Sequence, residues 1–109
     1  MNVRLYVWQR LTAAVMAPLV LVHVAVIFYA TRKGMSAVDI LARTRGSVVW
    51  ASFYGVFVAA VAIHAAIGGR NVLAEWSPLD DRRSGWAALV FGILLLALGL
   101  RAVAAVVLS

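Results

Sequence analysis

The sequence predicts an all-α membrane protein with three transmembrane helices, in a single domain over residues 1–109. Hydrophobic residues make up 65% of the 109 residues and charged residues only 13%, which excludes an ordinary soluble domain. The chain contains three apolar runs of about 20 residues, the length that crosses a bilayer as a helix. Because these runs occupy most of the chain, any aqueous catalytic part must come from partner chains.

The first span is expected at about residues 11–30, after a short basic start that contains Arg4 and Arg10. Its apolar run is longer than the core of a secretory signal and contains Pro18 and His23, which favours a retained span. A proline is tolerated inside a membrane helix when neighbouring groups satisfy the freed carbonyl. We therefore expect a kink at Pro18 that packs against another helix.

A basic connection follows at residues 31–46, and the spacing of Ser36 and Asp39 resembles a capping box. It predicts a brief helix at the membrane interface. The second span, at about residues 47–72, carries a stripe of small residues of the kind that lets membrane helices approach closely. These are Ser52, Gly55, Ala59, Ala62, Ala66 and Gly69. We therefore expect this helix to be packed by other helices.

A polar loop is expected at residues 74–85, since it contains Pro78 and the chain must leave the membrane there. The third span, at about residues 86–108, is mostly Leu, Ala and Val. Its one charge, Arg101, lies close enough to the end to snorkel, so this helix is expected to be mainly structural. All four tryptophans fall at predicted span ends, where an aromatic belt forms: Trp8, Trp50, Trp76 and Trp86.

The net charge of +6 does not indicate nucleic-acid binding, because the basic residues sit at the ends of apolar runs, where they anchor spans. The chain has no cysteine, so histidine and carboxylate are the remaining metal ligands. Charge alone does not orient the chain, since the cations divide evenly between the two membrane faces. One face has Arg4, Arg10, Arg82 and Arg83, and the other has Arg32, Lys33, Arg43 and Arg45.

Two histidines, His23 and His64, lie inside predicted spans. An ionisable side chain in hydrocarbon is costly and indicates a functional site. Ala60 and Gly68, one turn to either side of His64, leave room for a flat macrocycle, as axial haem ligation requires. The nearby Arg70 can pair with a propionate. Structural packing of both histidines, and a snorkelling role for Arg70, are the alternatives that the spacing leaves open.

The two histidines are predicted to lie at different depths. His23 is 13 residues from Arg10, while His64 is 6 residues from Arg70 on the same side of the membrane. At about 1.5 Å per residue the two levels differ by roughly 10 Å. Two ligands of one haem should share a depth, so we expect the histidines to serve different haems, each completed by a partner chain.

A polar cluster is expected where the first span begins and the second ends. It combines a cation, a carboxylate and an indole N–H at the edge of the hydrocarbon, which suits an amphipathic molecule with two carbonyl oxygens, such as a quinone. Its members are Gln9, Arg10, Thr12, Glu75 and Trp76. Polar residues are also ordinary at span ends, and an interface without a ligand is the alternative.

Two segments resemble the hydrophobic anchor (cytochrome b) subunit of succinate dehydrogenase and fumarate reductase, in its small three-helix form. The opening of that subunit is similar to WQRLTAAVMAPL, with an Arg-x-Thr-Ala run after an aromatic or polar lead. Its haem-ligand segment is similar to HAAIGGRNVLAEW, with a glycine at the fourth position after the histidine. The resemblance covers most of the chain and implies half of a two-chain helical bundle.

The resemblance implies that His64 is an axial ligand of haem b. Arg10 and Arg70 would then lie near propionates or quinone. Single-haem anchors lack a histidine at the position of His23, whereas the di-haem anchors have ligands in both the first and second spans. The resemblance therefore implies that His23 and His64 each ligate the iron of one of two haems, shared with a partner anchor chain.

The resemblance also places Glu75 and Trp76 at the acid and aromatic positions of the quinone pocket. Many relatives have tyrosine in place of Trp76, and an indole donates a hydrogen bond but does not accept one. The quinone contact at Trp76 is the point where this chain departs from the family pattern.

By the same resemblance, the chain would be a non-catalytic subunit of succinate:quinone oxidoreductase, the respiratory complex II of the tricarboxylic acid cycle. It would pass electrons between the iron–sulfur subunit and a membrane quinone, with dicarboxylate chemistry on partner chains. The implied partners are a second anchor chain, the iron–sulfur and flavoprotein subunits, and membrane lipids. The N-terminus and loop 74–85 would face the cytoplasm from a bacterial inner membrane.

Two other functions are considered. A non-redox packing or assembly subunit would use both histidines structurally and bind no haem. A small transporter with a histidine proton relay would need an acidic partner within the spans, and the acidic residues lie in or beside loops. That placement makes the transporter the weaker of the two.

Overall fold

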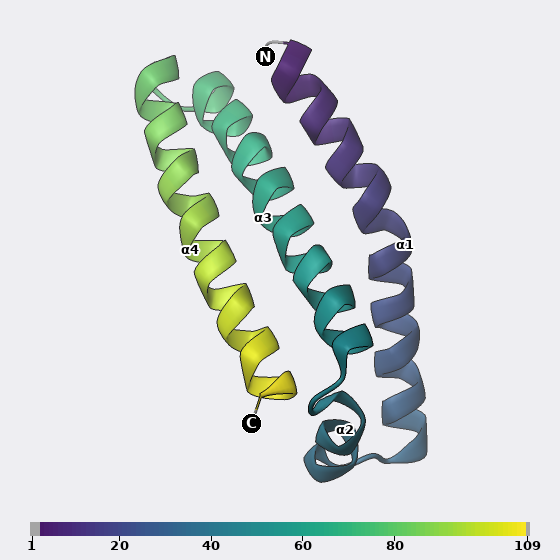
Figure 1. Ribbon diagram of the computed structural model, residues 1–109. Helices are drawn as coiled ribbons and strands as arrows, with labels where there is room; N and C mark the ends of the chain where they lie inside the picture. Colours follow the sequence, from purple (N-terminus) through teal and green to yellow (C-terminus); the bar gives the residue numbers. More distant parts are fainter. Residues whose placement is uncertain (1–2, 109) are drawn as a thin grey trace.

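The computed structural model describes residues 3–108, and these residues form four α-helices and no strand (Figure 1). Three helices are long: α1 (Val3–Lys33), α3 (Val48–Trp76) and α4 (Asp81–Val107). The short helix α2 (Ala37–Thr44) lies between α1 and α3 in the chain. Each long helix is long and apolar enough to cross a membrane. The prediction of an all-α protein with three transmembrane helices is therefore confirmed.

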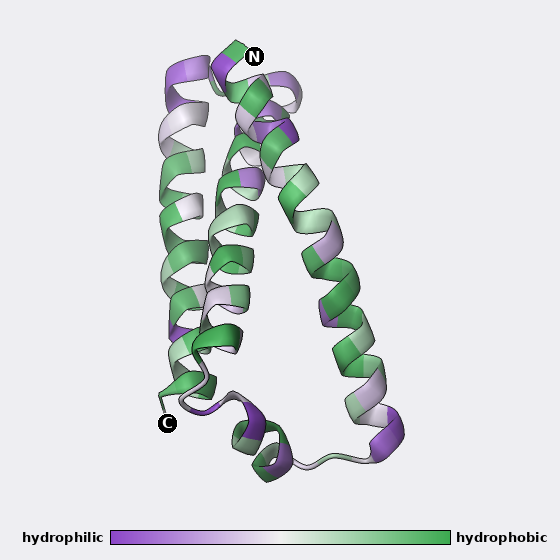
Figure 2. Cartoon of the chain, turned by 45° about the vertical axis from the view of Figure 1, so that its right-hand side comes forward, coloured by the Kyte–Doolittle hydropathy of each residue, from purple (hydrophilic) through white to green (hydrophobic). Residues whose placement is uncertain are grey.

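The middle position in the bundle belongs to α3, which packs against both α1 and α4. Figure 2 shows α4 running beside α3 along its length, whereas α1 meets α3 near the N-terminus and diverges from it toward α2. The two faces of α3 therefore have different neighbours: one is closely packed by α4, and the other opens progressively from α1.

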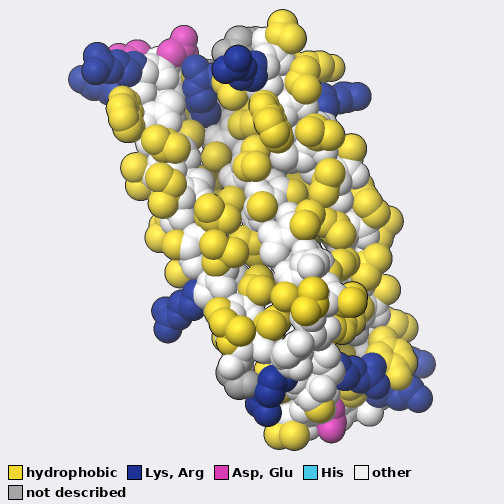
Figure 3. Space-filling model, viewed as in Figure 1, with side chains coloured by type: hydrophobic (Ala, Val, Ile, Leu, Met, Phe, Trp, Pro, Cys, Tyr) yellow, Lys and Arg dark blue, Asp and Glu magenta, His cyan; other side chains and the backbone are white. Residues whose placement is uncertain are grey.

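The outward faces of the long helices are apolar. Hydrophobic side chains cover the middle of the molecule in Figure 3, and most Lys and Arg side chains gather toward its two ends. Within residues 3–108, the buried apolar side chains are only Ala60, Ala62, Ile67 and Ala88. The remaining apolar surface has to meet lipid or another protein chain, as expected for an integral membrane protein.

The first long helix extends beyond the predicted span, because no residue before Leu11 breaks a helix. Its interior contains Pro18, which removes one backbone hydrogen-bond donor from the helix. Figure 1 shows α1 changing direction in its middle third, the part of the helix that includes this proline. A bend at such a position has an identifiable cause in the proline ring and the missing N–H.

The capping box predicted at the start of α2 is present. The Ser36 hydroxyl accepts a hydrogen bond from the Asp39 N–H, and the Asp39 carboxylate accepts one from the Ser36 N–H at 2.9 Å. Gly34 and Gly46 have φ values of 64° and 69° where the chain leaves α1 and α2. Glycine adopts this left-handed conformation without steric cost, so both turns suit their sequence.

The end of α2 is tied to the end of α4. The Thr44 hydroxyl donates to the Val106 carbonyl at 2.7 Å, and the Gly46 N–H donates to the Val107 carbonyl, also at 2.7 Å. The carbonyls of a last helical turn have no partner inside their own helix. These two bonds therefore close the C-terminal end of α4 with groups from the last residue of α2 and from the turn that follows it.

Small residues form the contact between α3 and α4. A Cβ atom built on Gly92 would lie 2.9 Å from the Ala66 Cβ, and one on Gly99 would collide with the Val58 side chain. The predicted small-residue stripe therefore faces α4 along part of its length. Gly55 is an exception, because a Cβ atom there would meet nothing within 4 Å.

The connection between α3 and α4 is shorter than the sequence suggests. The loop expected at residues 74–85 covers only residues 77–80, because polar side chains alone do not end a helix. The Ser77 hydroxyl donates back to a carbonyl in the last turn of α3. The Asp80 carboxylate caps α4 by accepting a hydrogen bond from the Arg83 N–H at 2.8 Å. These two caps set the helix ends.

We expect Gly99→Ala to destabilise the bundle by about 1–3 kcal/mol, because the new Cβ overlaps Val58 and α4 must shift. The matched control is Gly55→Ala, which adds the same methyl group to a helix in open space. Alanine is favoured over glycine inside a helix by roughly 0.5–1 kcal/mol, so the control should be neutral or stabilising. Reversible unfolding of the full chain in detergent micelles measures both. Equal losses in the two variants would contradict the close contact at Gly99.

The capping box of α2 is expected to make the stability of this helix depend on pH. Hydrogen bonds from the Ser36 backbone and side chain hold the pKa of Asp39 below its ordinary value of 3.8. A carboxyl group with a lowered folded pKa stabilises the fold above its unfolded pKa, and that stabilisation is lost as the pH falls through the folded pKa. We expect the amide protection of α2, corrected for intrinsic exchange rates, to be constant above about pH 5 and to fall below about pH 4.

The control for this measurement is Asp39→Asn, which keeps the size of the side chain and removes its titration. The variant should show weaker α2 protection near neutral pH and no acid transition in this helix. An acid transition of the same size in both proteins would show that the Asp39 carboxylate does not stabilise α2.

Candidate functional site

The imidazole of His64 faces α1 and meets Thr12. Its Nδ1 atom lies 3.2 Å from the Thr12 Oγ1 atom, across 52 residues of sequence. Thr12 is only 4% exposed, so this contact is shielded inside the packing of α1 against α3. The structure thus places His64, the expected haem ligand, against Thr12, which was expected at the quinone site. The sequence did not predict this contact.

Gln9 lies about one turn before Thr12 and packs near Gly68. Its Nε2 atom is 3.6 Å from the place that a Gly68 Cβ atom would occupy. Its Oε1 atom is buried and has no hydrogen-bond partner among residues 3–108. A buried polar atom without a partner costs free energy, so this end of the α1–α3 contact would gain from a further hydrogen-bonding group.

The other members of the predicted polar cluster lie on the surface. The Arg10 side chain is exposed, and its guanidinium lies 5.9 Å from the centroid of the Tyr6 ring. Glu75 and Trp76 are exposed in the last turn of α3, Trp76 to 83%. The structure therefore brings Gln9 and Thr12 to the His64 face, while the remaining members stay at the same end of the bundle without joining them (Figure 1).

Arg70 is directed toward α4. Its Nε atom lies 3.7 Å from the place that a Gly85 Cβ atom would occupy, and it borders a surface hollow together with Asp81 and Arg82. His64 instead meets α1. The two side chains lie less than two turns apart along α3 but face different neighbouring helices.

His23 is packed by aromatic side chains of α3. Its ring lies edge-to-face against Tyr54 and Phe57, with centroid separations of 5.6 and 5.4 Å. Its Nδ1 atom is 3.4 Å from the Tyr54 hydroxyl oxygen, a long contact for a hydrogen bond. Neither Tyr54 nor Phe57 was a candidate site residue, because only the register of α1 against α3 reveals which residues meet His23.

The two histidines lie at different depths. His23 is level with Tyr54 and Phe57, which precede His64 on α3 by 10 and 7 residues. At about 1.5 Å per residue this corresponds to roughly 10–15 Å along the helix axis. The separation is similar to the value expected from sequence spacing.

Each histidine has one ring nitrogen that remains available. The Nδ1 atoms of His23 and His64 make the contacts described above. Both histidines are partly exposed, and within residues 3–108 neither Nε2 atom is among the buried atoms that lack a hydrogen-bond partner. Both Nε2 atoms are therefore accessible at the surface of the chain, where a group carried between this chain and another can reach them.

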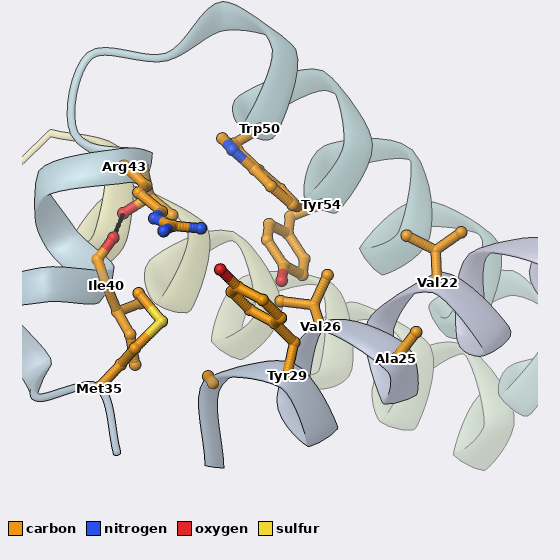
Figure 4. A pocket seen from close by; sticks show the side chains of 11 residues that line it. Val22, Ala25, Val26, Tyr29, Met35, Ile40, Arg43, Trp50 and Tyr54 are labelled. Atoms are coloured by element: carbon orange, nitrogen blue, oxygen red, sulfur yellow. Dashed lines mark hydrogen bonds between the residues drawn. The ribbon is translucent and has the colours of Figure 1, made fainter. Parts of the chain in front are cut away.

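A pocket of about 320 Å³ opens where α1 and α3 diverge. Figure 4 shows Tyr29, Trp50 and Tyr54 around it, with Arg43 of α2 at one side. This pocket was not predicted from the sequence, although Trp50 and Tyr54 are four residues apart on one helical face. Its other walls come from α1 and α2, whose placement the sequence does not supply. Since Tyr54 also contacts His23, the pocket and that histidine share a wall.

The family model of the succinate dehydrogenase/fumarate reductase transmembrane subunit matches residues 1–105. No curated protein and no solved structure matches the chain. The matched region includes all three long apolar helices almost completely, together with both histidines and Thr12. The chain therefore belongs to the succinate dehydrogenase/fumarate reductase transmembrane subunit family.

Proposed function

We propose that this chain binds haem b together with a second anchor chain and passes electrons between the iron–sulfur subunit and a membrane quinone. The observation that carries the proposal is the placement of His64. Its ring is fixed against α1 inside a membrane-spanning segment, and its Nε2 atom is accessible to an outside group. An intramembrane histidine with a free nitrogen is the donor that haem iron requires.

The residues around His64 are compatible with a haem. Ala60 and Gly68, one turn to either side, are small, but Ala60 is buried and Gly68 lies beside the Gln9 amide. A flat ring would therefore approach His64 from the Nε2 side of the imidazole. Arg10 and Arg70 lie toward the same end of the membrane and are our candidates for the propionates. Arg70 faces α4 in this chain, so its side chain would have to turn to reach a haem at His64. Haem b supplies one-electron transfer when it is bound, and the protein holds, orients and tunes it.

The second histidine extends the proposal to two haems. His23 also exposes its Nε2 atom, and it lies roughly 10–15 Å from the level of His64. Ligands at two depths cannot serve one haem on near-vertical helices. We therefore assign one ligand of each haem to this chain and the other ligands to the second anchor chain, so that the chain is half of a two-chain bundle.

The quinone site is proposed at the end of the bundle that carries Gln9, Arg10, Glu75 and Trp76. Thr12 is already engaged by His64 and buried, so its hydroxyl is turned away from this surface. The Gln9 amide has an unpaired oxygen and can turn to offer its N–H groups to a quinone carbonyl. The Trp76 indole is exposed and can only donate a hydrogen bond, which also suits a carbonyl.

The same end of the bundle is proposed to receive the soluble subunits. The N-terminus of α1 and the short connection between α3 and α4 lie there together (Figure 1). The iron–sulfur subunit would dock on this face with the flavoprotein subunit behind it, and dicarboxylate chemistry would occur on the flavoprotein. On this proposal, the N-terminus lies on the cytoplasmic side of a bacterial inner membrane.

Structural histidines are the second candidate, and the same contacts support it. A bond from His64 to Thr12 and one from His23 to Tyr54 would each help to hold α1 against α3 without any cofactor. The chain would then be a non-redox packing subunit. If the histidines ligate haem, replacing an imidazole removes a haem. If they are structural, replacing an imidazole weakens only the packing of α1 against α3.

We expect about one haem b per anchor chain, counting both this chain and the second anchor chain, in the complex purified from native membranes, measured by pyridine haemochrome and normalised to protein. His64→Leu and His23→Leu should each remove a different haem, because the two ligands lie at different depths. Redox titration of the remaining haem in each variant identifies which one was lost.

Half a haem per anchor chain, lost only with His64→Leu, would make His23 structural and the anchor a single-haem protein. No haem in the wild-type complex would contradict the electron-transfer function and leave the packing subunit. Gly55→Ala is the matched control, since it changes the same helix at an open position and should leave the haem content unchanged.

A further inference from the structure

The Thr12 hydroxyl has three polar neighbours. Its Oγ1 atom lies 2.7 Å from the Trp8 carbonyl oxygen and 3.1 Å from the Gln9 carbonyl oxygen, both in the preceding turn of α1. The third neighbour is the His64 Nδ1 atom at 3.2 Å. A hydroxyl has only one proton to donate, although its oxygen can accept further hydrogen bonds.

The distances decide where the Thr12 proton lies. A carbonyl oxygen can only accept, so a contact of 2.7 Å between Oγ1 and the Trp8 carbonyl requires the hydroxyl proton between them. If the proton pointed to His64 instead, two oxygen lone pairs would face each other at that distance. The proton therefore stays on the α1 side, and the Oγ1 atom presents a lone pair to the imidazole.

The protonation of His64 follows from this arrangement. Since Oγ1 accepts, Nδ1 must carry the hydrogen and donate it across the α1–α3 contact. A neutral imidazole has one protonated nitrogen, so Nε2 then has a free lone pair. The lone pair lies on the nitrogen that is accessible at the surface of the chain.

We propose that Thr12 is a positioning residue that holds His64 as the Nδ1–H tautomer and orients its ring, so that Nε2 is presented for coordination. This inference rests on the proposed haem-binding function and deepens it. Thr12 does not touch the iron; it acts through the histidine. Metal-bound histidines commonly donate their second N–H to a fixed oxygen, which sets the tautomer and raises the basicity of the ligand.

Burial makes this orientation persistent. Thr12 is 4% exposed, so its oxygen has little access to water as a substitute partner for the imidazole. The bond to the Trp8 carbonyl fixes the hydroxyl within α1. Turning the imidazole over would remove the N–H from its acceptor inside the membrane, where an unpaired donor is costly.

The environment of His23 provides a contrast within the same chain. Its partner is the Tyr54 hydroxyl at 3.4 Å, and this phenol has no short bond to a carbonyl of its own helix of the kind that Thr12 makes to Trp8. The tyrosine can therefore donate to Nδ1 or accept from it. The tautomer of His23 is not set by its partner, whereas that of His64 is.

The test uses Thr12→Val, which keeps the branched shape and removes the accepting oxygen. In the complex purified from native membranes, we expect either loss of the haem assigned to His64 or a higher midpoint potential for it. A less basic imidazole stabilises iron(III) less, so the oxidation equilibrium should move toward iron(II) by up to about tenfold, or ~59 mV for one electron. The g values of the low-spin ferric haem report the ring orientation.

Two further variants separate the oxygen from the packing. Thr12→Ser keeps the hydroxyl and should retain the wild-type haem content and potential. Thr31→Val is the matched control, because the Thr31 hydroxyl makes the same kind of bond to the Ile27 carbonyl at 2.8 Å on an exposed part of α1. It should behave as the wild type. If Thr12→Val does not accumulate in membranes, Thr12→Ala is compared with Thr12→Ser in its place.

Wild-type haem content, potential and g values in Thr12→Val would overturn the inference, as would a Thr12→Ser variant as defective as Thr12→Val. These outcomes differ from failure of the haem function itself. That failure appears as a wild-type complex without haem, or as His64→Leu retaining every haem, before any Thr12 variant is considered.

Discussion

The hydrogen bond between His64 and Thr12 depends on a constraint that governs the whole molecule. In hydrocarbon there is no water to pair with a polar group, so each one must find its partner inside the protein. The imidazole meets this requirement at a threonine whose own proton is already engaged. The bond therefore joins α1 to α3 and, at the same time, leaves the second imidazole nitrogen for an external group.

Backbone groups are also paired between segments at the C-terminal end of α4. The last carbonyls of α4 receive hydrogen bonds from Thr44 and Gly46, which is why a short helix closes that end. The two faces of α3 have different neighbours and different roles. On one face, small residues let α4 approach closely and brace the bundle. On the other face, His64 meets α1 and His23 of α1 packs against Tyr54 and Phe57. The divergence of α1 from α3 leaves room there for a pocket.

Much of the fold could be predicted from the sequence, because hydropathy and length define three spans and the Ser36–Asp39 pair defines the short helix. The helix ends were harder to predict from the sequence. Glu75 and Trp76 continue α3 because the first capping group is Ser77. The site was partly predictable, since a histidine inside a membrane span costs free energy and therefore indicates a functional site. Its partners were not, because which residue of α1 meets His64 depends on the relative rotation and height of two helices.

The most direct test is an experimental structure of the assembled complex, prepared from native membranes with all of its subunits. We predict that the His64 Nε2 atom coordinates a haem iron, while Nδ1 lies within hydrogen-bonding distance of the Thr12 oxygen. A haem coordinated elsewhere, or a His64 ring turned away from Thr12 with the iron on Nδ1, would contradict it.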